Sequence, residues 1–169
     1  MKVQRRPNGA FDLAQAPSHL IRRCQQYFGD LYALEAGARE LTPQQFTVLA
    51  ALEHNEGVSQ TALVEITGID RSTLAEMARR MVDKELLSRE RTEEDQRANA
   101  VAITAGGRKA LRSARLAAER AERALLETLP ASDRAKLVKL LAQIAAAGEA
   151  YAMNGAAKPH RKGPRRRRA

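Results

Sequence analysis

The sequence predicts a mainly α-helical protein in which a helix-turn-helix is followed by a short β-hairpin. Three observations support this fold class. Ala, Leu and Arg are abundant and aromatic residues make up only 4% of the chain, a composition that favours helices. Apolar residues recur at helical spacing along most of the 169 residues. The apolar period changes to two only within residues 87–103, where two short strands are expected.

The first predicted helix spans residues 18–36 and carries an apolar stripe. It follows a leader, residues 1–17, that we expect to be flexible and that ends on Pro17, a residue suited to the first turn of a helix. Gly37 closes this helix or marks a bend near its end. The residues of the stripe are Leu20, Cys24, Tyr27, Phe28, Leu31 and Leu34.

The next three predicted helices begin with recognisable caps. Thr42, with a proline after it and Gln45 three residues on, forms a capping box. Ser59 caps a short helix, and after a break at Gly68 the carboxylate of Asp70 caps a third helix. Two such helices joined by a short glycine-containing turn form a helix-turn-helix. Their inward-facing residues are expected to be Ala62, Leu63, Ile66, Leu74, Met77, Ala78 and Met81.

A β-hairpin and two long helices complete the predicted fold. Residues 87–91 and 99–103 read as strands around a charged turn, and a hairpin directly after a helix-turn-helix is the wing of a winged helix. Thr104 caps a long helix and Ser132 caps the last one. The apolar stripe of the last helix consists of Leu137, Leu140, Leu141, Ile144 and Ala147.

The basic charge of the chain is concentrated at its two ends. The net charge is +9, but residues 158–169 hold seven basic and no acidic side chains, and Lys2, Arg5 and Arg6 add three more. The chain between them is left at about −1, so its charge alone does not indicate nucleic-acid binding. We expect residues 154–169 to form a disordered basic tail that adds sequence-independent attraction for phosphates.

The sequence lacks the motifs of an enzyme or a metalloprotein. It has no phosphate-binding loop, no cysteine and histidine spacing for zinc, and only three histidines. We therefore expect no enzymatic activity, no cofactor and no metal. No apolar stretch suits a secretion signal or a membrane span. The single cysteine, Cys24, cannot form an internal disulfide, which suits a cytoplasmic protein.

The order of these elements resembles the MarR (multiple-antibiotic-resistance regulator) family over about residues 18–150. The most specific piece is residues 95–97 (DQR), followed by an alternating strand and by residues 103–107 (ITAGG). These are similar to the family's wing signature, D-x-R and then L-T-x-x-G, with isoleucine in place of the leucine. Residues 81–87 resemble the end of the family's recognition helix, with a Glu-Leu pair where Lys-Gly is common.

The resemblance implies a winged helix-turn-helix regulator that forms a triangular homodimer through its first and last two helices. The whole domain would span residues 18–153, with a DNA-binding lobe at about 42–104 and dimerisation helices at about 18–37 and 104–150. Each subunit would place its third helix in the major groove of a pseudopalindromic operator in double-stranded DNA and its wing over the adjacent minor groove. The long apolar stripes of the helices near the two ends of the chain agree with such a dimer, because one small domain is not large enough to cover them.

The start of the third helix holds the main candidates for contact with DNA. Arg71, Ser72 and Thr73 are expected to meet base edges, because N-terminal residues of a recognition helix lie nearest the bases. The alternative is an ordinary solvated first turn. Arg79 and Arg80 lie further along this helix and are expected to contact phosphates.

Further candidates for DNA contact lie in the wing and at other helix starts. Arg97 at the tip of the wing suits insertion into a narrow minor groove, and Asp95 is expected to orient a basic side chain. Helix starts can bind phosphates through backbone N–H groups, although the same residues also suit simple capping. The residues at these starts are Gln44, Ser59, Gln60 and Thr61.

A polar cluster on the first helix is the candidate ligand site. His19 lies three and four residues before Arg22 and Arg23, so the three share a helix face. This stretch resembles the first helix of family members that respond to aromatic acids, including hydroxynicotinate. An arginine would bind the ligand's carboxylate, His19 would donate to it or to a ring substituent, and Tyr27 would supply an apolar wall. The alternative is two solvated arginines beside a surface or interface histidine.

We therefore expect a bacterial, cytoplasmic repressor that a small aromatic carboxylate releases from its operator, with no membrane partner. One rival interpretation is a repressor of the same fold that senses oxidation through Cys24, although we expect this residue to be buried and inert. A rival of another class is an architectural or protein-interaction winged-helix protein without an effector.

Overall fold

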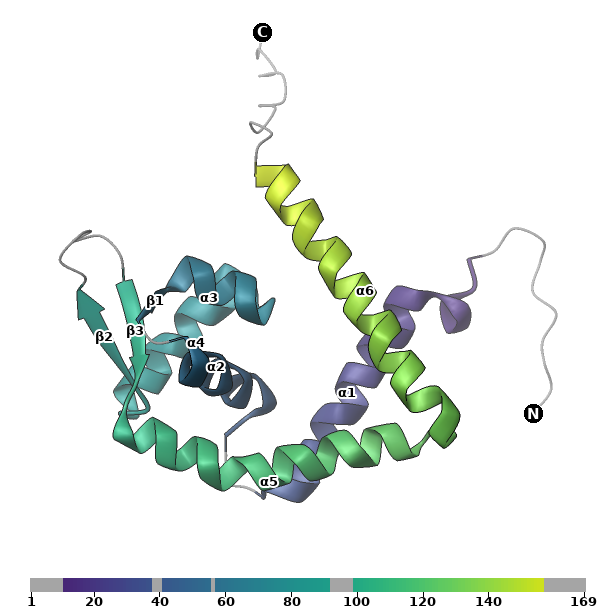
Figure 1. Ribbon diagram of the computed structural model, residues 1–169, viewed down its shortest axis with the longest axis horizontal. Coiled ribbons are helices and arrows are strands. Elements are labelled where there is room, and N and C mark those ends of the chain that lie inside the picture. Colours follow the sequence, from purple (N-terminus) through teal and green to yellow (C-terminus); the bar gives the residue numbers. More distant parts are fainter. Residues whose placement is uncertain (1–10, 38–40, 56, 92–98, 157–169) are drawn as a thin grey trace, which may run out of the picture. The chain divides into compact units, whose positions relative to one another are not determined.

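The structure is a computed structural model that describes residues 11–37, 41–55, 57–91 and 99–156 (Figure 1). It is mainly helical with one small antiparallel sheet, which confirms the predicted fold class. The chain divides into two compact units, Met1–Leu126 and Glu127–Ala169. Within the described ranges, no helix is long and apolar enough to cross a membrane.

The first unit contains the helix-turn-helix and the hairpin. Its elements in chain order are the 3-10 helix η1 (Leu13–Gln15), α1 (Pro17–Ala36), α2 (Pro43–His54), β1 (Val58–Ser59), α3 (Gln60–Thr67), α4 (Arg71–Asp83), β2 (Leu87–Arg91), β3 (Asn99–Ile103) and α5 (Ala105–Glu127). The second unit contains α6 (Ala131–Ala156).

The predicted caps of the first unit are present. The backbone N–H of Gln45 donates to Oγ1 of Thr42 at 3.2 Å and the Gln45 side chain accepts from the Thr42 N–H at 3.0 Å, which is a complete capping box. Ser59 Oγ caps α3 through the N–H of Ala62 at 3.2 Å. Thr104 Oγ1 accepts from the N–H of Gly107 at 2.9 Å. Short-range side-chain chemistry therefore fixes where these helices start.

Three residues differ from their predicted roles. Ser132 does not precede the last helix, because α6 begins at Ala131 and its first turn closes on the carbonyl of Pro130. Ile66 was expected to face inward but is 48% exposed. The short helix α3, of eight residues, buries only Leu63. Cys24 is exposed rather than buried, because α1 packs within the first unit through Tyr32 and its neighbours further along the helix.

The sheet contains a strand that the sequence pattern did not predict. The strand order is β1-β3-β2, with β2 and β3 paired in register from Leu87↔Ile103 to Arg91↔Asn99. The two residues of β1 pair with the other edge of β3, Val58 opposite Val101 and Ser59 opposite Ala100. The segment that leads into α3 is therefore hydrogen-bonded to the inner strand of the wing.

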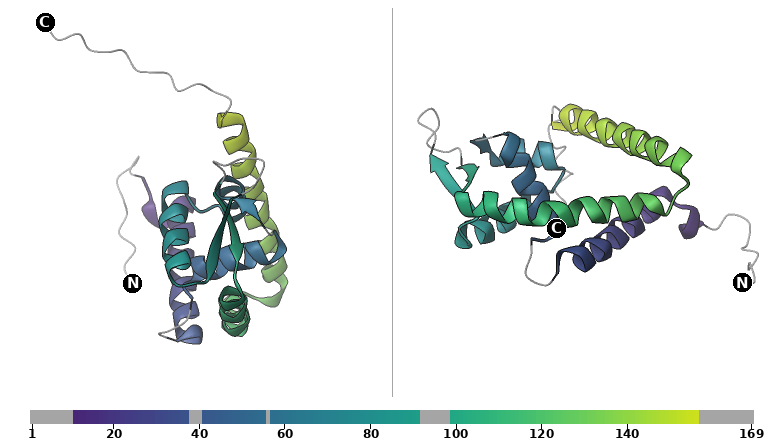
Figure 2. Two further views of the ribbon diagram at one scale, coloured as in Figure 1. Left: turned by 90° about the vertical axis from the view of Figure 1, so that its left-hand side faces the viewer. Right: turned by 60° about the horizontal axis from the view of Figure 1, so that its bottom comes forward.

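Two apolar clusters hold the first unit together. The larger cluster lies among α2, α3, α4, the sheet and the first half of α5. The smaller cluster joins α1 to α5, where Tyr32 packs with Ala118 and Ala121. Figure 2 shows α5 as the long helix that passes from the wing side of this unit towards α1. The buried members of the larger cluster include Val48, Leu49, Leu52, Leu63, Leu74, Met81, Leu87, Val101 and Leu111.

The turn after α4 is tight although no glycine makes it. Glu85 has φ of 57°, a left-handed conformation that favours glycine. Its carbonyl oxygen accepts from the hydroxyl of Thr104 at 2.6 Å. At Gly107 an added Cβ would meet the backbone carbonyl oxygen of Leu86 and lie 2.9 Å from Cγ1 of Ile103. This close approach requires a residue without a side chain.

Candidate functional site

The first turn of α4 is capped and fully presented to solvent. Asp70 Oδ1 accepts from the backbone N–H groups of Ser72 and Thr73, both at 3.0 Å, and from the Ser72 hydroxyl at 2.6 Å. These hydrogen bonds, with the Ser72 hydroxyl first, hold the pKa of Asp70 well below its ordinary value. Arg71, Ser72 and Thr73 are exposed, while Leu74 is buried beneath them. The three predicted base readers therefore stand together on the outer surface.

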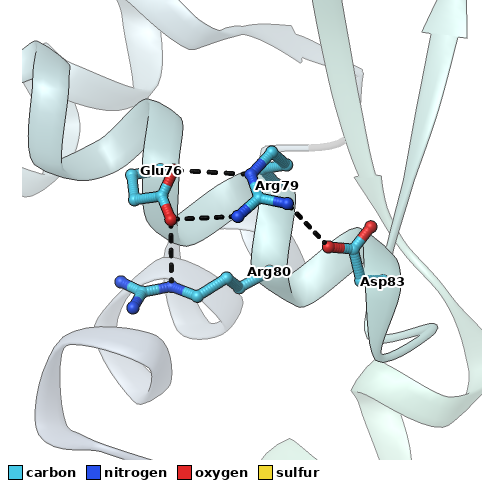
Figure 3. Close-up of polar contacts among 4 residues, drawn as sticks. All are labelled: Glu76, Arg79, Arg80 and Asp83. Carbon is cyan, nitrogen blue, oxygen red and sulfur yellow. Dashed lines mark hydrogen bonds and ion pairs between the residues drawn. The ribbon is translucent and has the colours of Figure 1, made fainter.

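Ion pairs along the same helix engage the two arginines predicted to contact phosphates. Glu76 Oε1 lies 3.1 Å from a terminal nitrogen of Arg79 and 3.8 Å from Nε of Arg80 (Figure 3). Asp83 Oδ2 lies 3.2 Å from the other terminal nitrogen of Arg79. The hydrogen bond from Arg79 lowers the pKa of Glu76. All four side chains are more than half exposed, so these arginines stay accessible to an approaching anion.

The other candidates at helix starts lie at the predicted positions. Gln44 is exposed in the first turn of α2, and Thr61 is exposed in that of α3. Ser59 and Gln60 are partly buried, and the Ser59 oxygen acts as the cap of α3. The capping role of Ser59 is therefore realised, and its hydroxyl hydrogen is still able to donate to an anion.

The wing is formed by β2 and β3, and the turn between them lies outside the described residues. Asp95 and Arg97 both belong to that turn, so their predicted contacts stay predictions from the sequence. Arg89 on β2 is exposed. The paired strands fix the base of the wing against the larger apolar cluster, because Leu87, Val101 and Ile103 are buried there.

A pocket of about 570 Å³ lies among α1, α2 and α5 within the first unit. Aromatic rings form much of its wall. The ring centroid of Tyr32 lies 6.3 Å from that of Phe28 and 6.3 Å from that of Phe46. Its volume is within the usual range for sites that take small molecules. The remaining residues of the wall are Pro43, Thr47, Arg115, Ala118, Glu119 and Glu122.

Charged groups of α5 give this pocket two chemically different ends. A terminal nitrogen of Arg115 donates to Oε2 of Glu53 on α2 at 2.6 Å. Glu119 and Glu122 follow one and two helical turns later. Partial burial raises the pKa of Glu122. The pocket therefore offers a cation at one end and hydrogen-bond acceptors at the other.

The four predicted ligand residues lie on α1 but do not line this pocket. Arg22, Arg23 and Tyr27 are exposed. His19 is partly buried, and its Nδ1 has no hydrogen-bond partner among the residues that the structure describes. The sequence pattern did not indicate the residues of α2 and α5 that line this pocket. Arg115 and its partner Glu53 are 62 positions apart, so no local spacing could indicate them.

Residues 40–98 match the sequence profile of the MarR family. The transcriptional regulator HosA of Escherichia coli O157:H7 is 33% identical over 102 residues, which cover 60% of this chain and 76% of that protein. The repressor NicR of Pseudomonas putida is 26% identical over 134 residues, covering 79% of this chain and 85% of NicR. Among solved structures, Bordetella bronchiseptica BpsR, whose DNA binding is regulated by 6-hydroxynicotinic acid, superposes with a TM-score of 0.74 at 26% identity. The match covers 80% of this chain and 97% of that one.

Proposed function

Because the chain belongs to the MarR family, we propose that it is a homodimeric repressor that leaves its operator when a small aromatic acid binds. The chain is a DNA-binding transcription regulator and not an enzyme. One observation carries the proposal at the residue level: the capped first turn of α4 presents Arg71, Ser72 and Thr73 together on the surface. Such a regulator would act on DNA in the bacterial cytoplasm.

In this proposal, the start of α4 contacts the bases and the surrounding elements contact the DNA backbone and the minor groove. Arg71, Ser72 and Thr73 would meet base edges of each half-site, and Arg79 and Arg80 would contact the backbone. We assign phosphate contacts to the first turns of α2 and α3 and the minor groove to the wing, with Arg97 inserted and Asp95 orienting a basic neighbour. The residues of those first turns are Gln44, Ser59, Gln60 and Thr61.

A second copy of the chain would cover the exposed apolar residues of α1 and α6. Large exposed apolar patches mark interfaces, and each of these helices carries several such residues when taken by itself. Between residues 131 and 151 of α6, no side chain is buried. The exposed residues are Leu20, Ile21, Tyr27 and Leu34 on α1, and Val138, Leu140, Leu141 and Ile144 on α6.

The pocket among α1, α2 and α5 suits a hydroxylated aromatic acid. Its rings would stack on the ligand, and Arg115 would bind the carboxylate through its planar guanidinium. Glu119 and Glu122 would accept from a ring hydroxyl or N–H group. Arg115 and Glu122 lie seven residues apart on one helix, roughly 10 Å along its axis, a span that their side chains can shorten to match one aromatic ring.

The polar cluster of α1 is a second place for the effector. His19 has an unpaired buried nitrogen among the described residues, and Arg22 and Arg23 lie one turn further along. Tyr27 would supply a ring beside them. The responses of the His19→Ala and Arg115→Ala variants to the acid separate this location from the pocket.

Effector binding would weaken the link between α5 and the DNA-binding lobe. The pair of Glu53 and Arg115 joins α2 to α5, and a ligand carboxylate competes with Glu53 for the same guanidinium. The effector releases DNA only if it prefers the arrangement that binds DNA poorly, so acid and operator must weaken each other's binding equally.

The exposure of Cys24 favours a second candidate function, oxidation sensing. In that case peroxide would release the protein from its operator, and the Cys24→Ser variant would stay bound.

The test begins with selection of operator duplexes from a random library by the full-length protein. Fluorescence anisotropy at fixed salt then compares the selected duplex with random DNA, with and without 6-hydroxynicotinate. We expect a preference for the selected duplex of about a thousandfold or more, and release by the acid. Equal affinity for both duplexes would support the architectural interpretation instead. Preference without release by acids would leave a repressor of another effector class.

A further inference from the structure

The outward face of α4 carries two carboxylates, Glu76 and Asp83, beside Arg79 and Arg80. Glu76 accepts from Arg79 through both oxygens, with Nε at 3.4 Å and a terminal nitrogen at 3.1 Å. Figure 3 shows Glu76 between the guanidinium groups of Arg79 and Arg80, with Asp83 on the far side of Arg79. A carboxylate therefore stands in the middle of the surface that is to face DNA.

The stability of the helix does not require this arrangement. Pairs three and four residues apart on a solvated helix face contribute little to stability, because water competes for both charges. Close to DNA, an uncompensated carboxylate would be repelled by phosphates. Glu76 is compensated, since two guanidinium groups lie against it. It is able to enter the major groove with its charge neutralised.

The chemistry of a carboxylate then restricts what Glu76 can read. The Arg79 hydrogen bond lowers its pKa, so Glu76 is ionised and acts only as an acceptor. In the major groove cytosine presents the N4 amino group alone. Adenine presents its N6 amino group beside the N7 acceptor, which repels a carboxylate. Cytosine is therefore the base that suits this side chain.

We propose that Glu76 is a specificity-determining residue that accepts a hydrogen bond from a cytosine amino group at one position of each half-site. Arg79 and Arg80 hold the carboxylate in place and contact the adjacent backbone. Glu76 lies in the first half of α4, the part of a recognition helix that reaches base edges. This inference rests on the proposed sequence-specific DNA binding and adds a base reader to Arg71, Ser72 and Thr73.

Selection of duplexes from a random library tests the proposal with the full-length chain. Glu76→Gln removes the charge but keeps the shape, and glutamine pairs with adenine through N6 and N7. The wild type is expected to select one C·G pair per half-site, preferred about tenfold, where the variant selects A·T or shows no preference. Asp83→Asn is the matched control, because it removes one carboxylate from the same pair network. We expect it to strengthen binding to all duplexes and to keep the wild-type motif.

The outcomes separate this proposal from the proposed function. An identical motif for the wild type and Glu76→Gln overturns the role of Glu76 and leaves sequence-specific binding intact. If Asp83→Asn shifts the same base position as Glu76→Gln, the carboxylates act only through their charge and the proposal is also wrong. A wild type that enriches no motif overturns both. Circular dichroism of each variant checks that α4 and its surroundings stay folded.

Discussion

The ion pair between Glu53 and Arg115 leads to a prediction about the affinity for the effector. A second ion pair of the same kind, between Glu35 and Arg120, serves as its control. Arg120 on α5 donates to Glu35 on α1, also at 2.6 Å. The arginine and glutamate side chains are 47% and 28% exposed in the first pair and 47% and 30% exposed in the second. Arg115 lines the pocket among α1, α2 and α5, whereas Arg120 does not. The second pair therefore reproduces the charge, distance and exposure of the first away from the proposed ligand.

The expected magnitudes follow from these geometries. Arg115→Ala removes charge-assisted hydrogen bonds worth about 1.5–3 kcal/mol, which weakens binding of an aromatic acid roughly 10- to 150-fold. Glu53→Gln has the opposite effect, because the carboxylate that competes for Arg115 is lost. A partly exposed pair is worth about 0–1 kcal/mol, so the acid should bind up to about fivefold more tightly. Arg120→Ala and Glu35→Gln should leave this affinity unchanged.

Isothermal titration calorimetry with 6-hydroxynicotinate measures these affinities at fixed pH and salt. Anisotropy of a labelled operator then measures the concentration of acid that releases the protein from DNA, which should be lower for Glu53→Gln than for the wild type. The reasoning is wrong if Arg115→Ala binds the acid as the wild type does. It is also wrong if Glu35→Gln tightens binding as much as Glu53→Gln, because a general change in charge would then explain both.

Four further predictions concern the turns, the cap and the polar cluster of α1. Gly107→Ala should lower the free energy of unfolding by roughly 1–3 kcal/mol in urea, since its Cβ meets the Leu86 carbonyl; unchanged stability would mean that the turn after α4 moves away from α5 without cost. Glu85→Gly should raise stability by about 0.5–1 kcal/mol by relieving a left-handed φ, and a loss of stability would count against strain there. The pKa of Asp70 lies below its ordinary 3.8, so its ionised cap stabilises the fold above that pH, and this contribution is lost as pH falls towards the lowered pKa. Between about pH 6 and pH 2.5, the melting temperature should fall less for Asp70→Asn than for the wild type. Equal falls in melting temperature would contradict this role of the cap. His19→Ala and Arg22→Ala should each abolish release by the acid and keep operator binding, if the α1 cluster is the effector site; an intact response would rule out this cluster as the effector site.

Local side-chain chemistry made much of the fold of residues 42–104 predictable from the sequence. The caps Thr42, Ser59 and Asp70 each act within three residues, so a short stretch of sequence contains all the information. The buried stripe of α4 was predictable for the same reason, because 3.6-residue periodicity is a property of one helix.

Features that depend on distant segments were not predictable. The two residues of β1 become a strand only because β3 lies beside them, some 40 positions later in the chain. The exposure of Cys24 depends on what covers α1, which its apolar period does not specify. The pocket combines three helices, and its cation, Arg115, is marked by an ion pair to a residue in another helix.

The pairing of β1 with β3 has a consequence for how such a protein changes during evolution. The strands of the wing and α4 pack into one apolar cluster, and β1, which leads into α3, pairs with β3 of the wing, so neither α4 nor the wing can be repositioned without disturbing the other. Base preference can then drift through exchanges of exposed side chains, one at a time. In the proposed dimer, the separation of the two half-sites is set instead by the helices that would join the two copies. Natural variants with altered operator spacing should therefore carry their substitutions in those helices, and variants with altered base preference in α4 or the wing.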